Sequence, residues 1–208
     1  MNWMKLTEER KVLAQVEHNK PLFLFVGKSA SGKTTIANML ESDGYSQVNS
    51  YTTRQPRYEG EIGHIFISEE KYNQLDNIVA STFYNGYHYC TTLDQVQNAD
   101  IYVIDPNGIE TLLEHFNVIN RPIYVFYFVT TICNRIQRMR NRHDSDTNIV
   151  SRLYNDEATD WKAKLYDIQA KNYWKMSLVP IGANQEVQEV YQYVKGLIKI
   201  YEKRGDQK

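Results

Sequence analysis

Residues 27–34 read Gly-Lys-Ser-Ala-Ser-Gly-Lys-Thr, and they follow the continuous apolar run Pro-Leu-Phe-Leu-Phe-Val at residues 21–26. Such a run is typical of a central parallel strand that is covered on both faces. Apolar residues at helical spacing predict a helix from Gly32 to about Ser42. The pattern G-x-x-x-x-G-K-[ST] between a buried strand and a helix predicts a phosphate-binding loop, the P-loop.

Each residue type in this loop suits the phosphates of a nucleotide. Glycines at both ends let the backbone curl so that successive N–H groups point inward, and the helix that follows adds the positive end of its dipole. Lys33 would place a mobile positive charge on the outer phosphates, and the Thr34 hydroxyl is suited to Mg²⁺. We therefore expect ATP and Mg²⁺ here. The expected phosphate-binding residues are Gly27, Ala30, Ser31, Gly32, Lys33, Thr34 and Thr35.

Three later segments extend the strand-and-helix pattern. Apolar runs at residues 101–105 and 123–129 are each followed by a helix-capable stretch, and a shorter run at 177–181 precedes a helix expected over 186–201. This alternation predicts an α/β fold, a P-loop NTPase-type parallel sheet flanked by helices. Residues 45–92 differ, because they hold short β-prone pieces rich in Tyr and Thr, and we expect a small β-rich insertion there.

The chain of 208 residues suits a single domain, residues 1–208, with a sizeable core. The predicted parts are a core over about 21–44, 93–130 and 172–204, the insertion over about 45–92, a polar helical lid over about 134–160, and an N-terminal helical extension over 1–20, with its helix at 4–18.

Composition excludes several classes of protein. The 24 Lys and Arg residues nearly balance 25 Asp and Glu, for a formal net charge of -1, which argues against a general nucleic-acid binder. Two cysteines, Cys90 and Cys133, are too few for a disulfide framework. No apolar run approaches the roughly 20 residues of a membrane span. We expect a cytoplasmic protein, a monomer or homodimer, with small-molecule substrates.

A second phosphate site is predicted at residues 50–57, which read Ser-Tyr-Thr-Thr-Arg-Gln-Pro-Arg. Arg54 and Arg57 flank a proline that stiffens the backbone, so both guanidinium groups can converge on one dianion. The alternative is a solvated pair of charges.

This segment, followed by Gly60-Glu61, resembles the nucleoside monophosphate binding segment of guanylate kinases. The P-loop, a later Tyr-x-Thr element at 89–91 and an Arg-rich segment occur in the same order, so the resemblance covers residues 22 to 155. It implies that Arg54, Arg57 and Tyr89 bind the acceptor phosphate. It also implies that Ser50 and Thr91 contact the base. His64 stands where a second phosphate-binding tyrosine is usual, and a histidine can also donate to phosphate.

Asp105 closes a predicted strand beside the P-loop, where an acid can organise Mg²⁺ through water. The resemblance places it near the base as well. Because Asp105-Pro106-Asn107 is also good helix-start chemistry, the alternative is a cap of the next helix.

Residues 138–146 read Arg-Met-Arg-Asn-Arg-His-Asp-Ser-Asp, and Arg152 follows. The segment is similar to the lid of the same family, through Arg138, Arg142 and Arg152. Arginines brought in by closure would stabilise the charge of a transferred phosphoryl group, and we expect these three to be catalytic together with Lys33. A solvent-facing charged helix is the alternative, especially for Arg135 and Arg140.

Besides His64, three positions depart from the family pattern. Ala80 stands at the guanine-reading glutamate, Cys90 at a usual glycine, and Val103 at the first acid of a strand-end pair. Without the carboxylate, discrimination between bases should weaken, because an unpaired buried donor costs about 1–3 kcal/mol.

The resemblance implies an ATP-dependent kinase that acts on a nucleoside monophosphate, GMP or dGMP. A kinase for another deoxynucleoside monophosphate or for ribose 1,5-bisphosphate is one alternative, since Gly60-Glu61 followed by His64 is also similar to the ribose bisphosphokinase pattern. A non-catalytic guanylate-kinase-like binding module is another, although such a module does not need Lys33 and Thr34. Asn184 is a candidate for the adenine contact.

Overall fold

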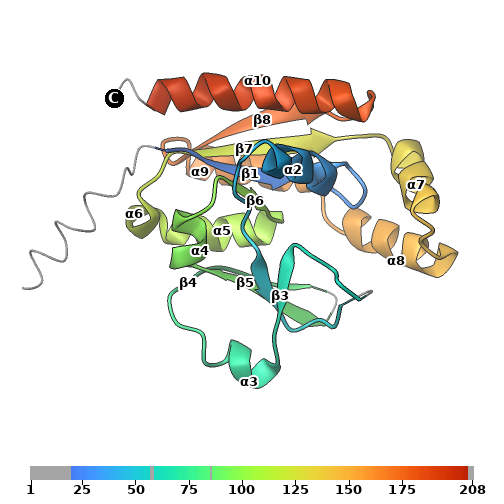
Figure 1. Cartoon of the computed structure of the whole chain (residues 1–208), viewed down its shortest axis with the longest axis horizontal. Helices are drawn as coiled ribbons and strands as arrows, with labels where there is room; N and C mark the ends of the chain where they lie inside the picture. Colours follow the sequence, from blue (N-terminus) through green and yellow to red (C-terminus); the bar gives the residue numbers. More distant parts are fainter. Residues whose placement is uncertain (1–19, 57–58, 85, 206–208) are drawn as a thin grey trace, which may run out of the picture.

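The computed structural model of the protein describes residues 20–56, 59–84 and 86–205. The expected helix over 4–18 and the candidate phosphate ligand Arg57 lie outside the described residues. Figure 1 shows a parallel sheet with helices on both faces, a smaller sheet beneath it, and two helices at one side. This arrangement confirms the predicted α/β fold with a β-rich insertion and a helical lid.

Four parallel strands form the core sheet in the order β6-β1-β7-β8. Their bounds are Leu22–Val26 (β1), Ile101–Val103 (β6), Ile123–Val129 (β7) and Met176–Gly182 (β8). Every residue of β1 is buried, because the strand has a neighbour on each edge and helices over each face. The continuous apolar run that opens the sequence pattern therefore has its expected place at the centre of the sheet.

One face of this sheet is covered by α2 (Lys33–Ser42) and α10 (Val187–Gly205), with aromatic rings between the layers. The rings of Phe25 and Phe126, on neighbouring strands, stack with centroids 5.8 Å apart. Ile36 and Leu40 of α2 pack on the same cluster. Their burial fixes α2 against the sheet and so fixes the loop that joins β1 to α2.

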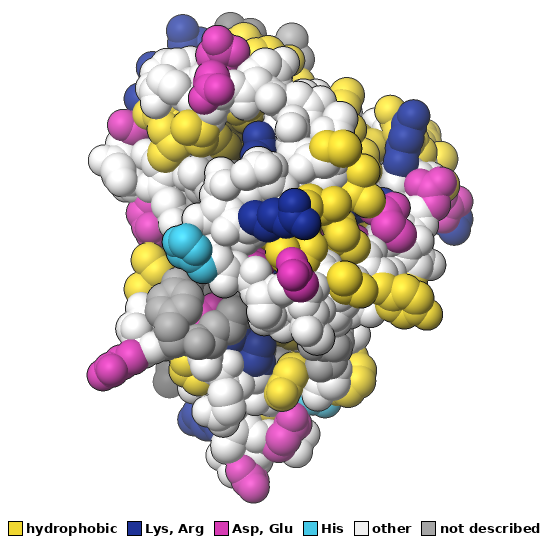
Figure 2. Space-filling view, turned by 90° about the vertical axis from the view of Figure 1, so that its right-hand side faces the viewer, with side chains coloured by type: hydrophobic (Ala, Val, Ile, Leu, Met, Phe, Trp, Pro, Cys, Tyr) yellow, Lys and Arg dark blue, Asp and Glu magenta, His cyan; other side chains and the backbone are white. Residues whose placement is uncertain are grey.

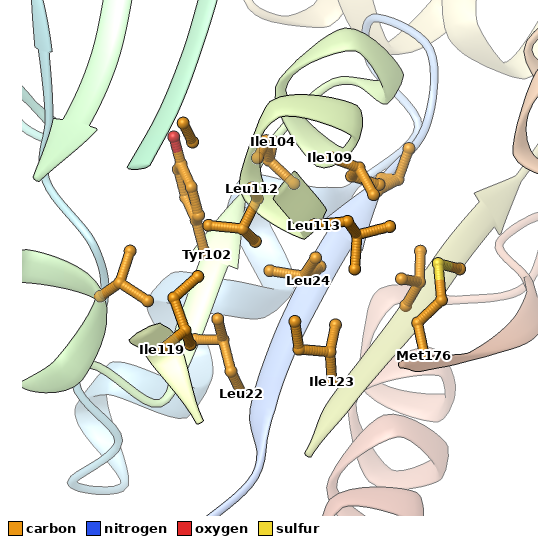
Figure 3. Packing of buried hydrophobic residues seen from close by; sticks show 14 of the residues in the cluster. Leu22, Leu24, Tyr102, Ile104, Ile109, Leu112, Leu113, Ile119, Ile123 and Met176 are labelled. Atoms are coloured by element: carbon orange, nitrogen blue, oxygen red, sulfur yellow. The ribbon is translucent and has the colours of Figure 1, made fainter. Parts of the chain in front are cut away.

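The opposite face is covered by short helices and by α9 (Trp161–Lys171). The short helices are α4 (Leu93–Gln97), α5 (Pro106–Glu114) and α6 (Phe116–Ile119). Figure 3 shows Leu112 and Leu113 of α5 packed against Leu22 and Leu24 of β1. This second cluster continues upward to Tyr102 and Ile104, at the edge that faces the insertion.

The insertion is a four-stranded sheet in the order β3-β2-β5-β4. Its elements are β2 (Ser50–Thr52), β3 (His64–Phe66), α3 (Glu69–Tyr72), β4 (Ile78–Tyr84) and β5 (Tyr87–Thr92). The β4-β5 and β2-β5 pairs are antiparallel and the β2-β3 pair is parallel. The Tyr- and Thr-rich stretch thus forms strands, as its residue types predict.

The lid consists of α7 (Ile132–Asn141) and α8 (Asp146–Glu157). Thr131 and Ser145 begin these helices, since each side chain accepts a hydrogen bond from the backbone N–H three residues later. The polar stretch that the sequence predicts as helical is therefore divided into separate helices by such caps.

Arg121 joins the start of β1 to the end of α4. It is 5% exposed, and its guanidinium donates to the carbonyls of Lys20, Pro21, Val96 and Ala99 at 2.6–2.8 Å. This role could not be predicted from the sequence, because an arginine in a polar loop is usually solvated.

Among the helices of the described ranges, none has both the length and the apolar character that a membrane-spanning segment needs.

Candidate active site

The P-loop joins β1 to α2, and its two glycines are there for different reasons. A Cβ on Gly27 would lie 2.6 Å from the Phe128 carbonyl oxygen, so only glycine fits against β7. Gly32 has φ +104°, a left-handed conformation that disfavours other residues, and it precedes the first turn of α2. Thr34 and Thr35 lie exposed in that first turn, beside the backbone N–H groups of the helix N-terminus.

Lys33 folds back over the loop, where its ammonium donates to the carbonyls of Gly27 and Lys28. Loss of surrounding water lowers the pKa of Lys33 from 10.5 to about 8, and the nearby carboxylate of Asp156 opposes this shift. Three cations reinforce it: Arg135, Arg142 and Arg152. These arginines of the lid therefore act electrostatically on the P-loop lysine.

A buried pair of charges attaches the lid to the P-loop. Arg135 and Asp156 are each 3% exposed in their side chains and form a close ion pair. Arg135 Nε donates to the Ser29 carbonyl at 2.9 Å, and Asp156 Oδ2 accepts from the Ser29 N–H at 2.8 Å. Glu157 accepts from Arg135 at 2.9 Å and from the Lys28 ammonium. We call Ser29, Arg135 and Asp156 the lid clamp. The alternative of a solvent-facing charged helix therefore does not hold for Arg135, whose side chain is buried.

The three predicted lid arginines have different surroundings. Arg138 donates to the carbonyls of Ser31 at 3.2 Å and Ala183 at 2.7 Å, so it lies against the P-loop. Arg142 is about half exposed and pairs with Asp144 at 2.6 Å, and Arg152 lies 3.9 Å from the same carboxylate. Figure 2 shows the face that carries the lid, where acidic and basic side chains are interspersed. Asp144 thus holds Arg142 and Arg152 close together.

One cleft of about 450 Å³ connects the P-loop to the insertion. Lys33 lies at its P-loop end, and Ser50, His64 and Tyr89 lie at its insertion end. The lid forms one of its walls, because Asn155 of α8 lines it together with Tyr84 at the tip of β4. The remaining lining includes Gly27, Ser29, Thr82, Tyr102, Asp105, Asn107, Asp156, Trp161 and Lys164. The P-loop and the insertion therefore open into one shared cleft.

Arg54 is held just behind this cleft. Its guanidinium forms two 2.9 Å bonds to Glu61 and hydrogen-bonds to Tyr89. The ring of Phe66 lies 5.2 Å from the guanidinium carbon, and among the described residues the buried Arg54 Nε has no hydrogen-bond partner. Tyr89 lines the cleft and Arg54 does not. Sequence reasoning missed the part played by Glu61, although its place after Gly60 was part of the resemblance.

His64 and Ser50 are partners across the β2-β3 pair, and their side chains hydrogen-bond at 2.9 Å. The His64 ring also lies edge-on to Tyr89, with centroids 5.7 Å apart. Thr91 is fully buried and donates to the Tyr102 hydroxyl at 2.6 Å. The structure thus gathers Ser50, His64 and Tyr89 at the cleft and places Thr91 beneath it.

Asp105 caps α5, as the alternative reading of its sequence context predicts. One carboxylate oxygen accepts from the N–H groups of Asn107 at 2.7 Å and Gly108 at 3.1 Å. Burial raises the pKa of Asp105, against these hydrogen bonds and one from Thr82. Asp105 also lines the cleft, at the same sheet edge as the P-loop, because β6 and β1 are parallel neighbours. A role toward metal-bound water stays a prediction.

The oxygen atoms near the P-loop suit Mg²⁺. A hydroxyl from Thr34 and the carboxylate of Asp105 are hard ligands of the type this ion binds. No group of three His, Cys, Asp or Glu residues that could hold a metal exists in the part of the chain that is described.

Asn184, the candidate adenine contact, uses its amide oxygen within the protein. The oxygen accepts from Thr130, Thr131 and Asn134 at 2.8–3.1 Å, and so joins the loop after β8 to the start of α7. Its contact with adenine stays a prediction.

No family model and no curated protein matches the chain. Among solved structures, it is similar to guanylate kinase from Anaplasma phagocytophilum, with 15% identity and a TM-score of 0.51 over 88% of this chain and 87% of that one. Deoxyadenosine kinase from M. mycoides with bound dATP has 13% identity and a TM-score of 0.45 over 86% of this chain and 99% of that one. At 15% identity, the first likeness concerns the fold alone. The chain is a divergent protein with the fold of guanylate kinase.

Proposed function

We propose that the protein transfers the γ-phosphoryl group of ATP·Mg²⁺ to a nucleoside monophosphate, with GMP or dGMP as the acceptor that the sequence resemblance implies. The observation that carries this proposal is the single cleft between Lys33 and the cluster of Ser50, His64 and Tyr89. A donor site and an acceptor site that open into one shared cleft would allow direct transfer.

In this proposal the P-loop amides and Lys33 hold the donor phosphates, and Tyr89, backed by Arg54, binds the acceptor phosphate. An acceptor phosphate oxygen attacks the γ-phosphorus, the bond to the β-γ bridging oxygen breaks, and ADP and the nucleoside diphosphate form. The attacking oxygen is already anionic, so no general base is required. Arg142 and Arg152 stabilise the charge on the transferred group. Mg²⁺, when bound, neutralises charge on the phosphates.

The test is an ADP-release assay with a panel of acceptors: GMP, dGMP, the other ribo- and deoxyribonucleoside monophosphates, and ribose 1,5-bisphosphate. Lys33→Ala should lower kcat at least about 100-fold, because it removes the charge on the transferred phosphates. Lys162→Ala, which removes an exposed lysine of α9, is the control and should leave kcat unchanged.

The assay also separates the alternatives. Turnover of ribose 1,5-bisphosphate without any nucleotide acceptor would make the protein a sugar-phosphate kinase of the same fold. No turnover, together with ligand binding that survives Lys33→Ala, would favour a binding module and refute the proposed transfer.

A further inference from the structure

A pair of buried hydroxyl groups lies beneath the acceptor end of the cleft and has no part in the transfer described above. Thr91 Oγ1 donates to Tyr102 Oη at 2.6 Å. Thr91 has no exposed surface and Tyr102 is 5% exposed, yet Tyr102 lines the cleft. The phenol is therefore the member of the pair that a ligand can reach.

The small size of Ala80 leaves space for this phenol. Ala80 of β4 is the cross-strand partner of Thr91 in β5, and both Ala80 and Tyr102 belong to one buried cluster. Figure 3 shows the Tyr102 ring rising from that cluster, with its hydroxyl at the end away from Leu22 and Ile123. A large polar side chain at position 80 would compete for this space, so the phenol takes a place where the resemblance predicts a carboxylate.

The hydroxyl of Tyr102 is suited to donate a hydrogen bond to a ligand. Because Thr91 donates to the phenolic oxygen, the phenolic proton remains for another acceptor, and within the described ranges Thr91 is the one hydrogen-bond partner found for Tyr102. Burial raises the pKa of Tyr102, so the phenol stays protonated in neutral solution. A buried donor without an acceptor is costly, which favours a ligand that supplies one.

We propose that Tyr102 is a specificity-determining residue, whose O–H donates to an acceptor atom on the base of the bound monophosphate; for GMP this atom is O6. The inference rests on the proposed function and deepens it. Asp105, which lines the same part of the cleft, can accept from the neighbouring ring N–H. With Ala80 beside the phenol, the 2-amino group of guanine has no carboxylate at that position.

Two analogues of GMP test which atom is recognised. IMP lacks the 2-amino group, and 2-aminopurine riboside monophosphate lacks O6 and the neighbouring N1–H, so the effect of Tyr102→Phe on both acceptors is needed to assign the O6 contact. For the unmodified protein we expect kcat/KM for IMP within about threefold of GMP. For the aminopurine analogue, kcat/KM should be roughly 10- to 100-fold lower than for GMP, because the analogue leaves the buried phenol unpaired.

Tyr102→Phe removes the hydroxyl and keeps the ring. We expect it to lower kcat/KM for GMP roughly 10- to 100-fold while changing the value for the aminopurine analogue less than about threefold. Tyr127→Phe is the matched control, because Tyr127 belongs to the same buried cluster but does not line the cleft. The ratio of two acceptors measured on one variant is independent of partial unfolding.

The outcomes separate this inference from the function on which it rests. Absence of transfer to every nucleoside monophosphate would refute the proposed function. If the protein transfers phosphate to GMP but Tyr102→Phe lowers kcat/KM equally for GMP and the aminopurine analogue, the proposed function stands and the role of Tyr102 is overturned. A preference for GMP over IMP of more than about tenfold would contradict the expectation for the 2-amino group, since that group would then have a strong partner.

Discussion

The lid clamp allows a quantitative prediction about stability. Asp156→Ala would leave the buried Arg135 guanidinium without its closest counter-charge and the Ser29 N–H without an acceptor. Breaking a buried ion pair from one side costs about 3–5 kcal/mol. Glu157 still accepts from Arg135, which places the expected loss in the free energy of unfolding near 3 kcal/mol. In a domain of this size, that lowers Tm by roughly 6–12 °C.

Urea unfolding followed by circular dichroism measures this loss, and Asp144→Ala is the control. Asp144 is also a lid carboxylate paired with an arginine, but the Arg142 side chain is 46% exposed, so the control should lose less than about 1 kcal/mol. The double variant Arg135→Met/Asp156→Met should recover most of the stability, because apolar side chains can replace a buried pair at little cost.

Two results would refute this reasoning. A loss in Asp156→Ala no larger than in Asp144→Ala would mean that the pair is not buried in solution. A double variant that loses as much as the sum of its single variants would mean that Arg135 and Asp156 are not coupled.

Three further changes test other contacts. Glu61→Gln should raise the KM for the acceptor about tenfold and leave the KM for ATP unchanged, because it weakens the bidentate hold on Arg54; equal effects on both KM values would contradict this. Arg121→Met should cost at least about 4 kcal/mol in urea unfolding, since four carbonyls lose a charged donor, and a loss below about 1 kcal/mol would refute that role. Burial raises the pKa of the Cys90 thiol from 9.0 to about 11, so between these values the unfolded chain loses its proton first and stability falls as pH rises. The free energy of unfolding of Cys90→Ala, measured in urea titrations, should therefore fall less between pH 8.5 and 10.5 than that of the unmodified protein. Equal slopes of this free energy against pH in the two proteins would contradict the raised pKa of Cys90.

The sequence predicted the parts of the protein whose cause is local. The P-loop depends on two glycines, a lysine and a threonine at fixed spacing between an apolar run and a helix, and all of these are adjacent in the chain. The parallel strands and the tyrosine-rich insertion could be recognised because strand and helix periodicities are properties of neighbouring residues. Ser50, His64 and Tyr89 were predicted from the family resemblance, and the cleft brings them together.

The tertiary structure decided which polar side chains are buried and with which partners. Arg135 and Arg142 lie seven residues apart in one Arg-rich segment, yet the first is buried in the lid clamp and the second is half exposed. Likewise, nothing near Tyr102 in sequence indicates that its hydroxyl meets that of Thr91. Ion pairs and hydrogen bonds depend on distances of a few ångströms between elements. Those distances are set by how helices and sheets pack, and a local pattern of residue types does not contain them.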